Sequence, residues 1–211
     1  MPGWGWSRLA DPYKKGSLAA KFRERRRQRF LAWLPRQART VIDVGGTAKF
    51  WEGSNLKITV LSPNPPEVGV NWIQGTVKDL YQFREAEFDV AFSNSVIEHV
   101  GPDRGEMARQ MPRVGRSFWV QTPNRRFPVE PHFLFPGFQF LPIERRIWLV
   151  QNFDLGWCGR IPDAAQARAA VEEITLLDRS ELQRLFPSAT IEPERFFGLN
   201  KSWIAHFAQE G

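Results

Sequence analysis

The fold is decided by Val41-Ile42-Asp43-Val44-Gly45-Gly46-Thr47, an apolar run that ends in an acid and two glycines. Short apolar, β-branched runs bounded by glycine are typical of buried strands. Glycine lets the backbone approach a ligand closely, and an acid beside it can bond a polar group of that ligand. The stretch therefore predicts either a strand end that binds a ligand or an ordinary buried strand that enters a tight turn.

A second segment has a related form. The apolar run Phe88-Asp89-Val90-Ala91-Phe92 is followed by the small polar residues Ser93-Asn94-Ser95 and then by Val96-Ile97-Glu98-His99-Val100. Together the two segments resemble the first and fourth strands of the class I S-adenosylmethionine-dependent methyltransferases, in particular the small-molecule group called type 11. The resemblance covers residues 39–121 and implies S-adenosylmethionine as the cofactor.

Composition sets bounds on the fold. A chain of 211 residues with 42% apolar residues can bury one sizeable core. Its one cysteine, Cys158, cannot form an internal disulfide, and no apolar run has the length needed to cross a bilayer. The first residues do not have the uninterrupted apolar stretch of a signal peptide. We therefore expect a cytoplasmic protein.

The positive charge belongs to one segment. Residues 1–40 hold 11 Lys or Arg against 2 acids, whereas the other 171 residues hold 18 bases and 21 acids. Six of the 11 bases in residues 1–40 lie in residues 21–30. A basic helix there can bind phosphate-rich or anionic lipid surfaces, or it can be a solvated face that keeps the protein soluble.

The order of elements predicts an α/β fold. We expect a helix over 17–34, which Ser17 caps and Pro35 ends, and strands over 40–44, 56–61, 68–73, 88–93 and 117–121. Helices over 164–173 and 178–185 and strands over 190–196 and 202–207 follow. Strands separated by helical connections indicate a parallel sheet. The expected fold is a Rossmann-like, mostly parallel seven-stranded sheet flanked by helices.

Two segments stand outside this pattern. Residues 1–38 form a basic N-terminal helical extension, and residues 39–211 form the methyltransferase domain that the resemblance implies. Within that domain, residues 125–160 are dense in aromatics and prolines, which disfavours a regular strand or one long helix. We interpret this segment as a lid or substrate insertion. The alternative is a surface subdomain that packs its own aromatics.

The resemblance implies a set of cofactor-binding residues. It assigns the amino-acid end of the cofactor to the turn after the first strand, the ribose to the end of the second, the adenine to the residues after the third, and the methionine portion to the end of the fourth. In that order the residues are Asp43, Gly45, Gly46 and Thr47; Ser62 and Asn64; Thr76 and Val77; Ser93 and Asn94.

The chain departs from the family pattern at three points. Thr47 and Lys49 stand where the second and third glycines of the turn belong. No acid follows the second strand, so Ser62 and Asn64 must bind the ribose without charge-assisted bonds. No acid follows Gly75, and Thr76, with Asp79 as the fallback, is left to bond the adenine.

The candidates for acceptor chemistry are His99, Glu98 and His132. Methyl transfer requires no metal in principle, and a base is needed only when the acceptor must lose a proton. His99 lies near the fourth strand end, and histidine exchanges protons near neutral pH. His132 lies in the aromatic insertion. Each of the three side chains can instead have a packing or surface role, and Trp51, Trp119 and Trp203 are expected in the core.

The sequence thus favours a methyltransferase that acts on a small or amphipathic acceptor at oxygen or nitrogen. Three alternatives remain open: an RNA methyltransferase that uses the basic helix, a non-catalytic partner subunit with a degenerate cofactor site, and an enzyme that docks on a membrane surface through the basic helix and residues 133–141.

Overall fold

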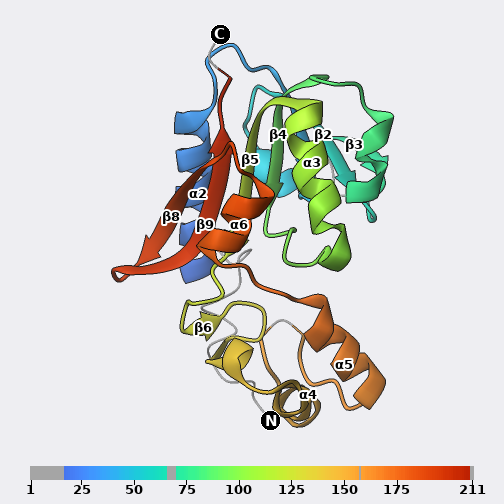
Figure 1. Cartoon of the computed structure of the whole chain (residues 1–211), viewed down its shortest axis with the longest axis vertical. Coiled ribbons are helices and arrows are strands. Elements are labelled where there is room, and N and C mark those ends of the chain that lie inside the picture. Colours follow the sequence, from blue (N-terminus) through green and yellow to red (C-terminus); the bar gives the residue numbers. More distant parts are fainter. Residues whose placement is uncertain (1–16, 66–69, 157, 210–211) are drawn as a thin grey trace. The chain divides into compact units, whose positions relative to one another are not determined.

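The computed structural model describes residues 17–65, 70–156 and 158–209 (Figure 1). The chain divides into two compact units. The sheet unit comprises Leu34–Asn124 and Leu176–Gly211, and the insertion unit comprises Met1–Trp33 and Arg125–Thr175. No helix in the described part of the chain has the length and apolar character needed to cross a membrane.

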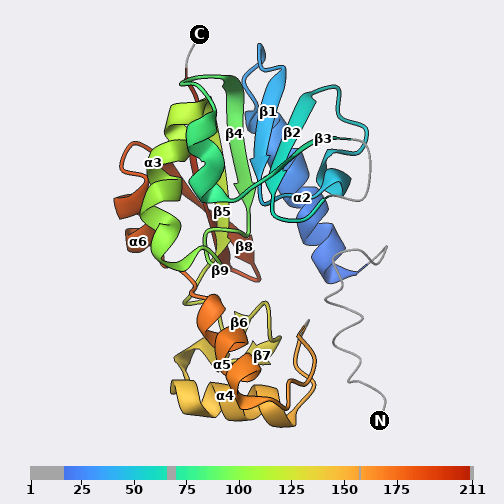
Figure 2. The ribbon, with the colours of Figure 1, turned by 90° about the vertical axis from the view of Figure 1, so that its right-hand side faces the viewer.

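A seven-stranded sheet forms the centre of the sheet unit (Figure 2). Five strands run parallel in the order β3-β2-β1-β4-β5, and β9 and β8 continue the sheet as an antiparallel pair beside β5. This confirms the predicted α/β fold with a mostly parallel sheet. The strands are β1 (Thr40–Val44), β2 (Lys57–Ser62), β3 (Asn71–Gln74), β4 (Phe88–Asn94), β5 (Gly115–Pro123), β8 (Thr190–Phe196) and β9 (Leu199–Phe207).

The strand order reverses next to β1. The chain runs from β1 outward to β2 and β3, then returns to the other side of β1 as β4 and continues to β5. In open parallel sheets, ligands bind outside the carboxyl ends of the strands at such a reversal. In the register of the pair, Asp43 lies beside Phe92, so the ends of β1 and β4 lie at the same edge.

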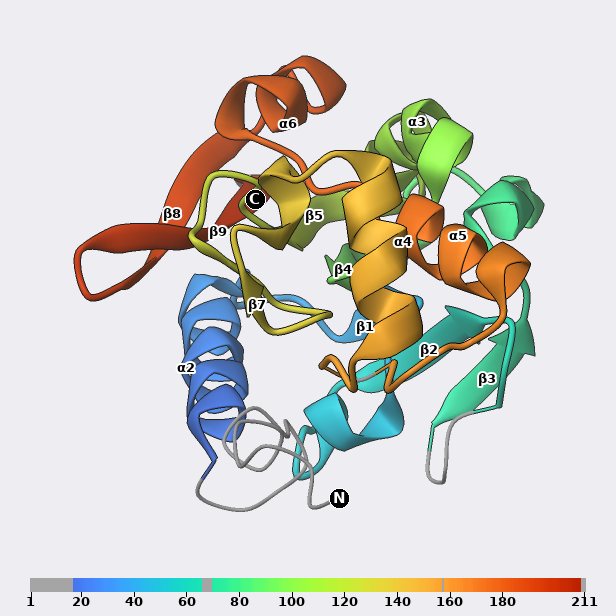
Figure 3. The same cartoon turned by 90° about the horizontal axis from the view of Figure 1, so that it is seen from below.

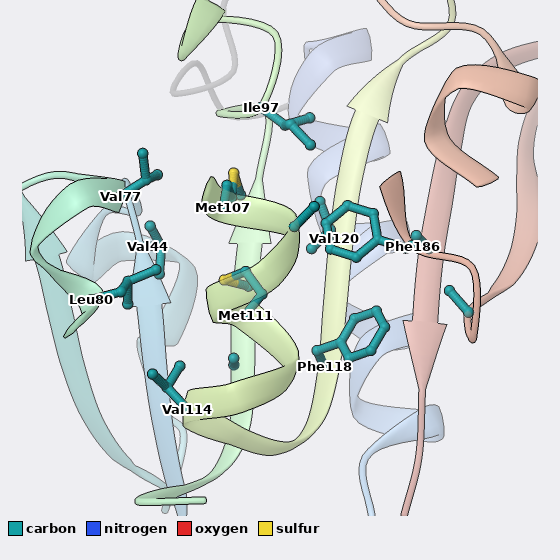
Figure 4. Close-up of a cluster of buried hydrophobic side chains, with 14 of the residues drawn as sticks. Val44, Val77, Leu80, Ile97, Met107, Met111, Val114, Phe118, Val120 and Phe186 are labelled. Atoms are coloured by element: carbon teal, nitrogen blue, oxygen red, sulfur yellow. The ribbon is translucent and has the colours of Figure 1, made fainter. Parts of the chain in front are cut away.

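Helices and apolar side chains cover one face of this sheet. The helix α3 (Arg104–Val114) lies along β4 and β5, and it contacts the 3-10 helix η2 (Val77–Gln82) and α6 (Arg179–Leu185) (Figure 2). Met107 and Met111 of α3 are fully buried and face a cluster of aliphatic and aromatic side chains (Figure 4). That cluster includes Val44, Leu80, Ile97, Phe118, Val120 and Phe186.

The insertion unit has an apolar core of its own. It contains α2 (Leu18–Trp33), a small sheet of β6 (Val129–Glu130) and β7 (Phe135–Pro136), the 3-10 helix η4 (Phe138–Phe140), α4 (Ile143–Asn152) and α5 (Ala164–Glu173). The helices α4 and α5 contact each other (Figure 3). The core comprises Phe133, Phe138, Ile147, Val150, Ala167 and Val171. The segment therefore packs its own aromatics, and the compact unit continues to Thr175.

Most element boundaries lie within a few residues of the predicted ones. Ser17 caps α2 through a hydrogen bond from the N–H of Ala20 to Oγ, 3.0 Å long. The expected third strand begins at 68, but residues 66–69 lie outside the described part, and β3 begins at Asn71. The aromatic segment contains the ten-residue helix α4 because the prolines end at Pro142.

The last strand is longer than predicted. The sequence indicated 202–207, but β9 begins at Leu199 and pairs with Phe196 of β8. Only Phe197 and Gly198 connect the two strands, and both have positive φ angles, 46° and 80°. Two-residue hairpin turns of this kind match the twist of the flanking strands, so the pairing continues up to the turn.

Candidate functional site

The turn after β1 contains a fully buried carboxylate. Asp43 is 0% exposed, and its Oδ2 accepts a hydrogen bond of 2.6 Å from Nε1 of Trp51. Its Oδ1 is buried and has no hydrogen-bond partner among the residues that the structure describes. Burial raises the pKa of Asp43 from 3.8 to about 7, against the lowering effect of the Trp51 hydrogen bond. The carboxyl group therefore exchanges its proton near neutral pH.

Both glycines of the turn are required by the geometry. Gly45 has a φ of 74°, which is unfavourable for residues with a Cβ, and a Cβ there would lie 2.7 Å from the Val96 side chain. A Cβ on Gly46 would lie 1.7 Å from Oδ2 of Asp43. The carboxylate thus occupies the space that a side chain at position 46 would need, while Gly45 itself is exposed and Gly46 is half-buried.

Aromatic side chains surround the buried acid. The 3-10 helix η1 (Ala48–Trp51) follows the turn and places Phe50 and Trp51 against Phe92 of β4, with ring centroids 4.8 and 5.1 Å apart. These three rings are almost fully buried. They exclude water from the carboxylate, which explains why burial is the largest influence on its pKa.

The end of β4 is tied to its neighbours by serine hydroxyls. Ser93 is fully buried, and its Oγ donates to the carbonyl oxygen of Val44 over 3.0 Å. The next serine, Ser95, has a φ of 56° and donates both its N–H and its hydroxyl to Gln121 of β5. Between them, Asn94 is half-buried as the last residue of β4. The predicted residues Ser93 and Asn94 thus lie at the edge where β1 ends.

Glu98 is buried, contrary to the reading of this residue as a helix surface position. It is 0% exposed, and its Oε2 accepts a hydrogen bond of 2.9 Å from Oγ1 of Thr122 on β5. Arg104 donates to the carbonyl oxygens of Ile97 and Glu98, which fixes the loop after β4. His99 follows in the same loop and is half-buried. The sheet therefore holds a carboxylate and an imidazole beside the carboxyl ends of β4 and β5.

The predicted ribose residues lie after β2. The hydroxyl of Ser62 donates to the carbonyl oxygen of Asn64 over 2.6 Å and accepts from Nε1 of Trp72 over 3.2 Å. Its proton is therefore taken, and toward a ligand it can only accept a hydrogen bond. Asn64 itself is exposed. Its amide is the better placed of the two to bond a hydroxyl group.

The predicted adenine residues form a helix cap. Thr76 Oγ1 accepts from the N–H of Lys78 and donates to Oδ2 of Asp79, which also accepts from the N–H of Thr76. This is a capping box at the start of η2. The side chain of Val77 is buried in the core of the sheet unit. The hydroxyl of Thr76 and the carboxylate of Asp79 therefore both take part in the helix cap, a role that the sequence pattern did not indicate.

His132 lies in the insertion unit and is held by a buried acid. Glu130 is 2% exposed, and its Oε1 lies 2.7 Å from Nδ1 of His132. Its Oε2 accepts from the N–H groups of His132 and Phe133 over 2.7 and 2.6 Å. Gly156 adjoins them, where a Cβ would lie 1.9 Å from the His132 carbonyl oxygen. Glu130 is not among the predicted site residues, although it lies two positions before His132 in the sequence.

The structure brings some of these residues together and not others. Asp43, Gly45, Gly46 and Ser93 lie at the carboxyl ends of β1 and β4, with Thr47 in the same turn. Trp51, which sequence reasoning assigned to the core, is buried as expected and is also the hydrogen-bond partner of Asp43. Its apolar character and lack of local periodicity gave no signal of this second role.

Comparison with protein families gives one match, in the region that contains the turn after β1 and the end of β4. A family model described as a methyltransferase domain matches residues 28–117, which span β1 to β4 and the start of β5. A search of curated protein sequences gives no match.

Solved structures share the fold at low sequence identity. The 1,6-didemethyltoxoflavin-N1-methyltransferase of Burkholderia thailandensis, with bound 1,6-didemethyltoxoflavin and S-adenosylhomocysteine, is 17% identical, covers 96% of this chain and 87% of its own, and has a TM-score of 0.54. A protein of Pyrococcus horikoshii is 15% identical, with coverages of 99% and 100% and a TM-score of 0.59. An S-adenosylmethionine-dependent methyltransferase of Thermotoga maritima is 14% identical, with coverages of 95% and 96% and a TM-score of 0.55.

Proposed function

We propose that this chain is a class I S-adenosylmethionine-dependent methyltransferase, in keeping with the matched methyltransferase domain and the shared fold, and that it methylates a small or amphipathic acceptor at oxygen or nitrogen. The observation that carries the proposal is the Glu130–His132 pair inside an aromatic insertion, because it combines a base with an apolar surrounding. The exposed Cys158 has a free thiol, in keeping with a cytoplasmic enzyme.

The turn after β1 fits the cofactor. The buried Oδ1 of Asp43 has no partner in the described residues, and an ammonium group would supply one. Gly45 is exposed and Gly46 is half-buried, so a ligand would be able to approach the backbone of this turn. Asn64 would bond a ribose hydroxyl, and the backbone at Thr76 and Val77 would lie near the adenine. Ser93, Asn94 and Thr47 complete the set that would line the rest of the cofactor.

When bound, the cofactor supplies a methyl group activated on a sulfonium, so the protein's own tasks are orientation and proton transfer. His132 is the proposed base. In the tautomer whose Nδ1–H donates to the Glu130 carboxylate, Nε2 would be the basic nitrogen of the neutral ring. A base with this orientation would take the O–H or N–H proton that the acceptor loses when it is methylated.

The loop after β4 supplies two further candidates. Glu98 and His99 lie beside the ends of β4 and β5, and Thr122 holds the Glu98 carboxylate. In this proposal they orient the acceptor, and either could take the proton if His132 does not. Turnover measured for variants of Glu98, His99 and His132 would separate acceptor orientation from proton transfer.

The residues of the sheet unit that flank the insertion lie next to each other. The insertion leaves the sheet unit after Asn124 and returns at Leu176, and Asn124 pairs with Leu177 in a parallel bridge. Both ends are therefore anchored beside the carboxyl end of β5, the edge at which open α/β sheets bind ligands. This anchoring supports a role for residues 125–175 in acceptor binding.

The test combines a binding measurement with a transfer measurement. Isothermal titration should show S-adenosylhomocysteine binding to the full chain. Incubation with methyl-labelled cofactor should then place label in a small-molecule extract and not in total RNA supplied in parallel. Absent binding contradicts the enzymatic assignment of this chain, and label confined to RNA contradicts the proposed acceptor class.

The basic helix supports RNA as a second candidate acceptor. In α2, Lys21 and Arg25 are exposed, whereas Arg26 is buried. If RNA is bound, the double reversal Lys21→Glu/Arg25→Glu should weaken it and reduce the slope of log affinity against log salt by about 2. The matched control Lys57→Glu/Arg179→Glu reverses two exposed bases of the sheet unit and should leave the slope unchanged. Equal slopes in both variants exclude the helix as the RNA site.

A further inference from the structure

The indole of Trp51 holds one oxygen of the buried acid at the cofactor turn. Its Nε1 lies 2.6 Å from Oδ2 of Asp43, and edge-on packing against Phe50 and Phe92, with centroids 4.9 and 5.1 Å away, fixes the ring. Trp51 is 5% exposed and Asp43 is 0% exposed. One carboxylate oxygen is therefore held in place, whereas the other, Oδ1, is buried and has no hydrogen-bond partner among the described residues.

The strands on both sides of β1 place apolar residues beside Asp43. Val60 of β2 and Phe92 of β4 lie beside Asp43 in the register of the sheet. Lys49, the charged residue of η1, is exposed. Burial and the Trp51 hydrogen bond are the two influences on the Asp43 pKa, and no charged side chain of the described residues is among them. An ionised carboxylate with a single donor in such a place is costly, so a proton or a cation must accompany it.

We propose that Trp51 is a positioning residue that presents Oδ1 of Asp43 to the ammonium group of the cofactor, and that this ammonium replaces a proton on Asp43 as the cofactor binds. The proton leaves the carboxyl group for solvent, and the carboxylate pairs with the ammonium. The inference rests on the proposed function and adds a ligand requirement, because only ligands with an amino-acid end can drive the exchange.

The protonation state of Asp43 in the free protein determines how proton release and S-adenosylhomocysteine affinity change with pH. With the pKa of Asp43 at about 7, the carboxyl group is mostly protonated at pH 6, and binding should release close to one proton. Release should fall to about half a proton at pH 7 and toward zero above pH 8. The affinity for S-adenosylhomocysteine should therefore rise with pH, by up to about tenfold per unit below pH 7.

The experiment measures affinity and proton release together. The full chain is titrated with S-adenosylhomocysteine at pH 6, 7 and 8 in buffers of different ionisation enthalpy. Trp51→Phe keeps the aromatic ring and removes the N–H, which should move the half-release point upward by about one pH unit and weaken binding at pH 7 about tenfold. 5′-Methylthioadenosine, which lacks the amino-acid end, should bind both proteins equally and release no proton.

Two variants make the result specific. Trp203→Phe alters another buried tryptophan whose Nε1 has no hydrogen-bond partner among the described residues, and it should leave affinity and proton release unchanged. Asp43→Asn should abolish proton release, a test that holds even if Trp51→Phe does not fold. Unchanged proton release in either Asp43→Asn or Trp51→Phe overturns the inference and leaves the proposed function standing. Absent S-adenosylhomocysteine binding by the unaltered chain at every pH overturns both.

Discussion

The carboxylate of Asp43 fills the position that a side chain at Gly46 would need, because a Cβ on Gly46 would lie 1.7 Å from Oδ2 of Asp43. Gly46→Ala must therefore displace either the turn or the carboxylate. We expect the free energy of unfolding to fall by about 1–3 kcal/mol, as in other overpacked sites, and S-adenosylhomocysteine binding to weaken at least about tenfold. Urea unfolding and isothermal titration measure the two effects.

Gly105→Ala is the matched control for this substitution. Gly105 lies in α3, and a Cβ there would meet nothing within 4 Å. Alanine should leave binding unchanged and add up to about 1 kcal/mol of stability, because it favours the helix. Similar behaviour of the two variants would show that the turn does not depend on the glycine at position 46.

Glu130→Gln should inactivate the proposed base without removing it. A glutamine amide would donate to Nδ1 of His132, so the ring proton would move to Nε2, and Nε2 could no longer accept a proton. We expect turnover to fall by about 10²-fold with unchanged S-adenosylhomocysteine affinity. Nitrogen-15 NMR of the His132 ring detects the exchanged tautomer directly.

His206→Gln is the control for the histidine pair. Nε2 of His206 lies 3.6 Å from Oε1 of Glu192 in the β8–β9 pair, so it is also a histidine beside an acid. Its loss should leave turnover unchanged. Equal losses in Glu130→Gln and His206→Gln would mean that both act on stability and that the Glu130 pair has no special part in turnover.

Thr122→Val should destabilise the protein through Glu98. The hydroxyl of Thr122 donates to the fully buried Glu98 carboxylate over 2.9 Å, and valine has nearly the same shape without that donor. We expect a loss of about 1–3 kcal/mol in the free energy of unfolding, the typical cost when a buried polar group loses a partner. Thr122→Ser retains the hydroxyl and should recover most of the loss, whereas equal values for both variants would contradict the role of this hydrogen bond.

Asp89 links β4 to the start of β1 and should contribute stability only above acidic pH. Burial raises its pKa, but bonds from the N–H groups of Arg39 and Thr40 and from the Thr40 hydroxyl lower it, with a net value below 3.8. A depressed folded-state pKa stabilises the protein above the unfolded value, and this contribution is lost as pH falls through the folded value.

Asp89→Asn should therefore reduce stability by about 1 kcal/mol at pH 7, and its difference from the unaltered chain should shrink as the pH falls below the unfolded-state pKa of 3.8. Glu85→Gln, at an exposed position nearby, should change stability little at any pH. Denaturant unfolding at pH 7, 5 and 3 measures the difference, and a constant difference across this range would contradict the linkage.

Much of the architecture was accessible from local patterns. The runs at 40–44 and 88–93 become β1 and β4 with almost unchanged bounds, because apolar, β-branched residues bounded by glycine or small polar residues have few other stable conformations. Boundaries set by pairing partners were less accurate. The last strand gained three residues because its extent depends on a tight turn with β8, and not on its own apolar run.

The candidate site was predictable only in part. Asp43, Gly45 and Gly46 are close in sequence, so their arrangement follows from one turn. The partners of Glu98 and Ser93 are 24 and 49 residues away, and no local pattern specifies them. Glu130 adjoins His132, but the burial that makes it an orienting acid depends on the packing of the whole insertion.

The sequence by itself determined a mostly parallel α/β sheet and the acid-glycine turn after its first strand, because both depend on short-range hydrophobic patterning and backbone freedom. Only the tertiary structure decided the chemistry of that turn. Trp51 reaches Asp43 because η1 folds back over β1 and β4, and the exclusion of water by the surrounding rings brings the pKa of that acid to about 7. Such a shift arises from the environment of a side chain, and residue type alone does not encode it.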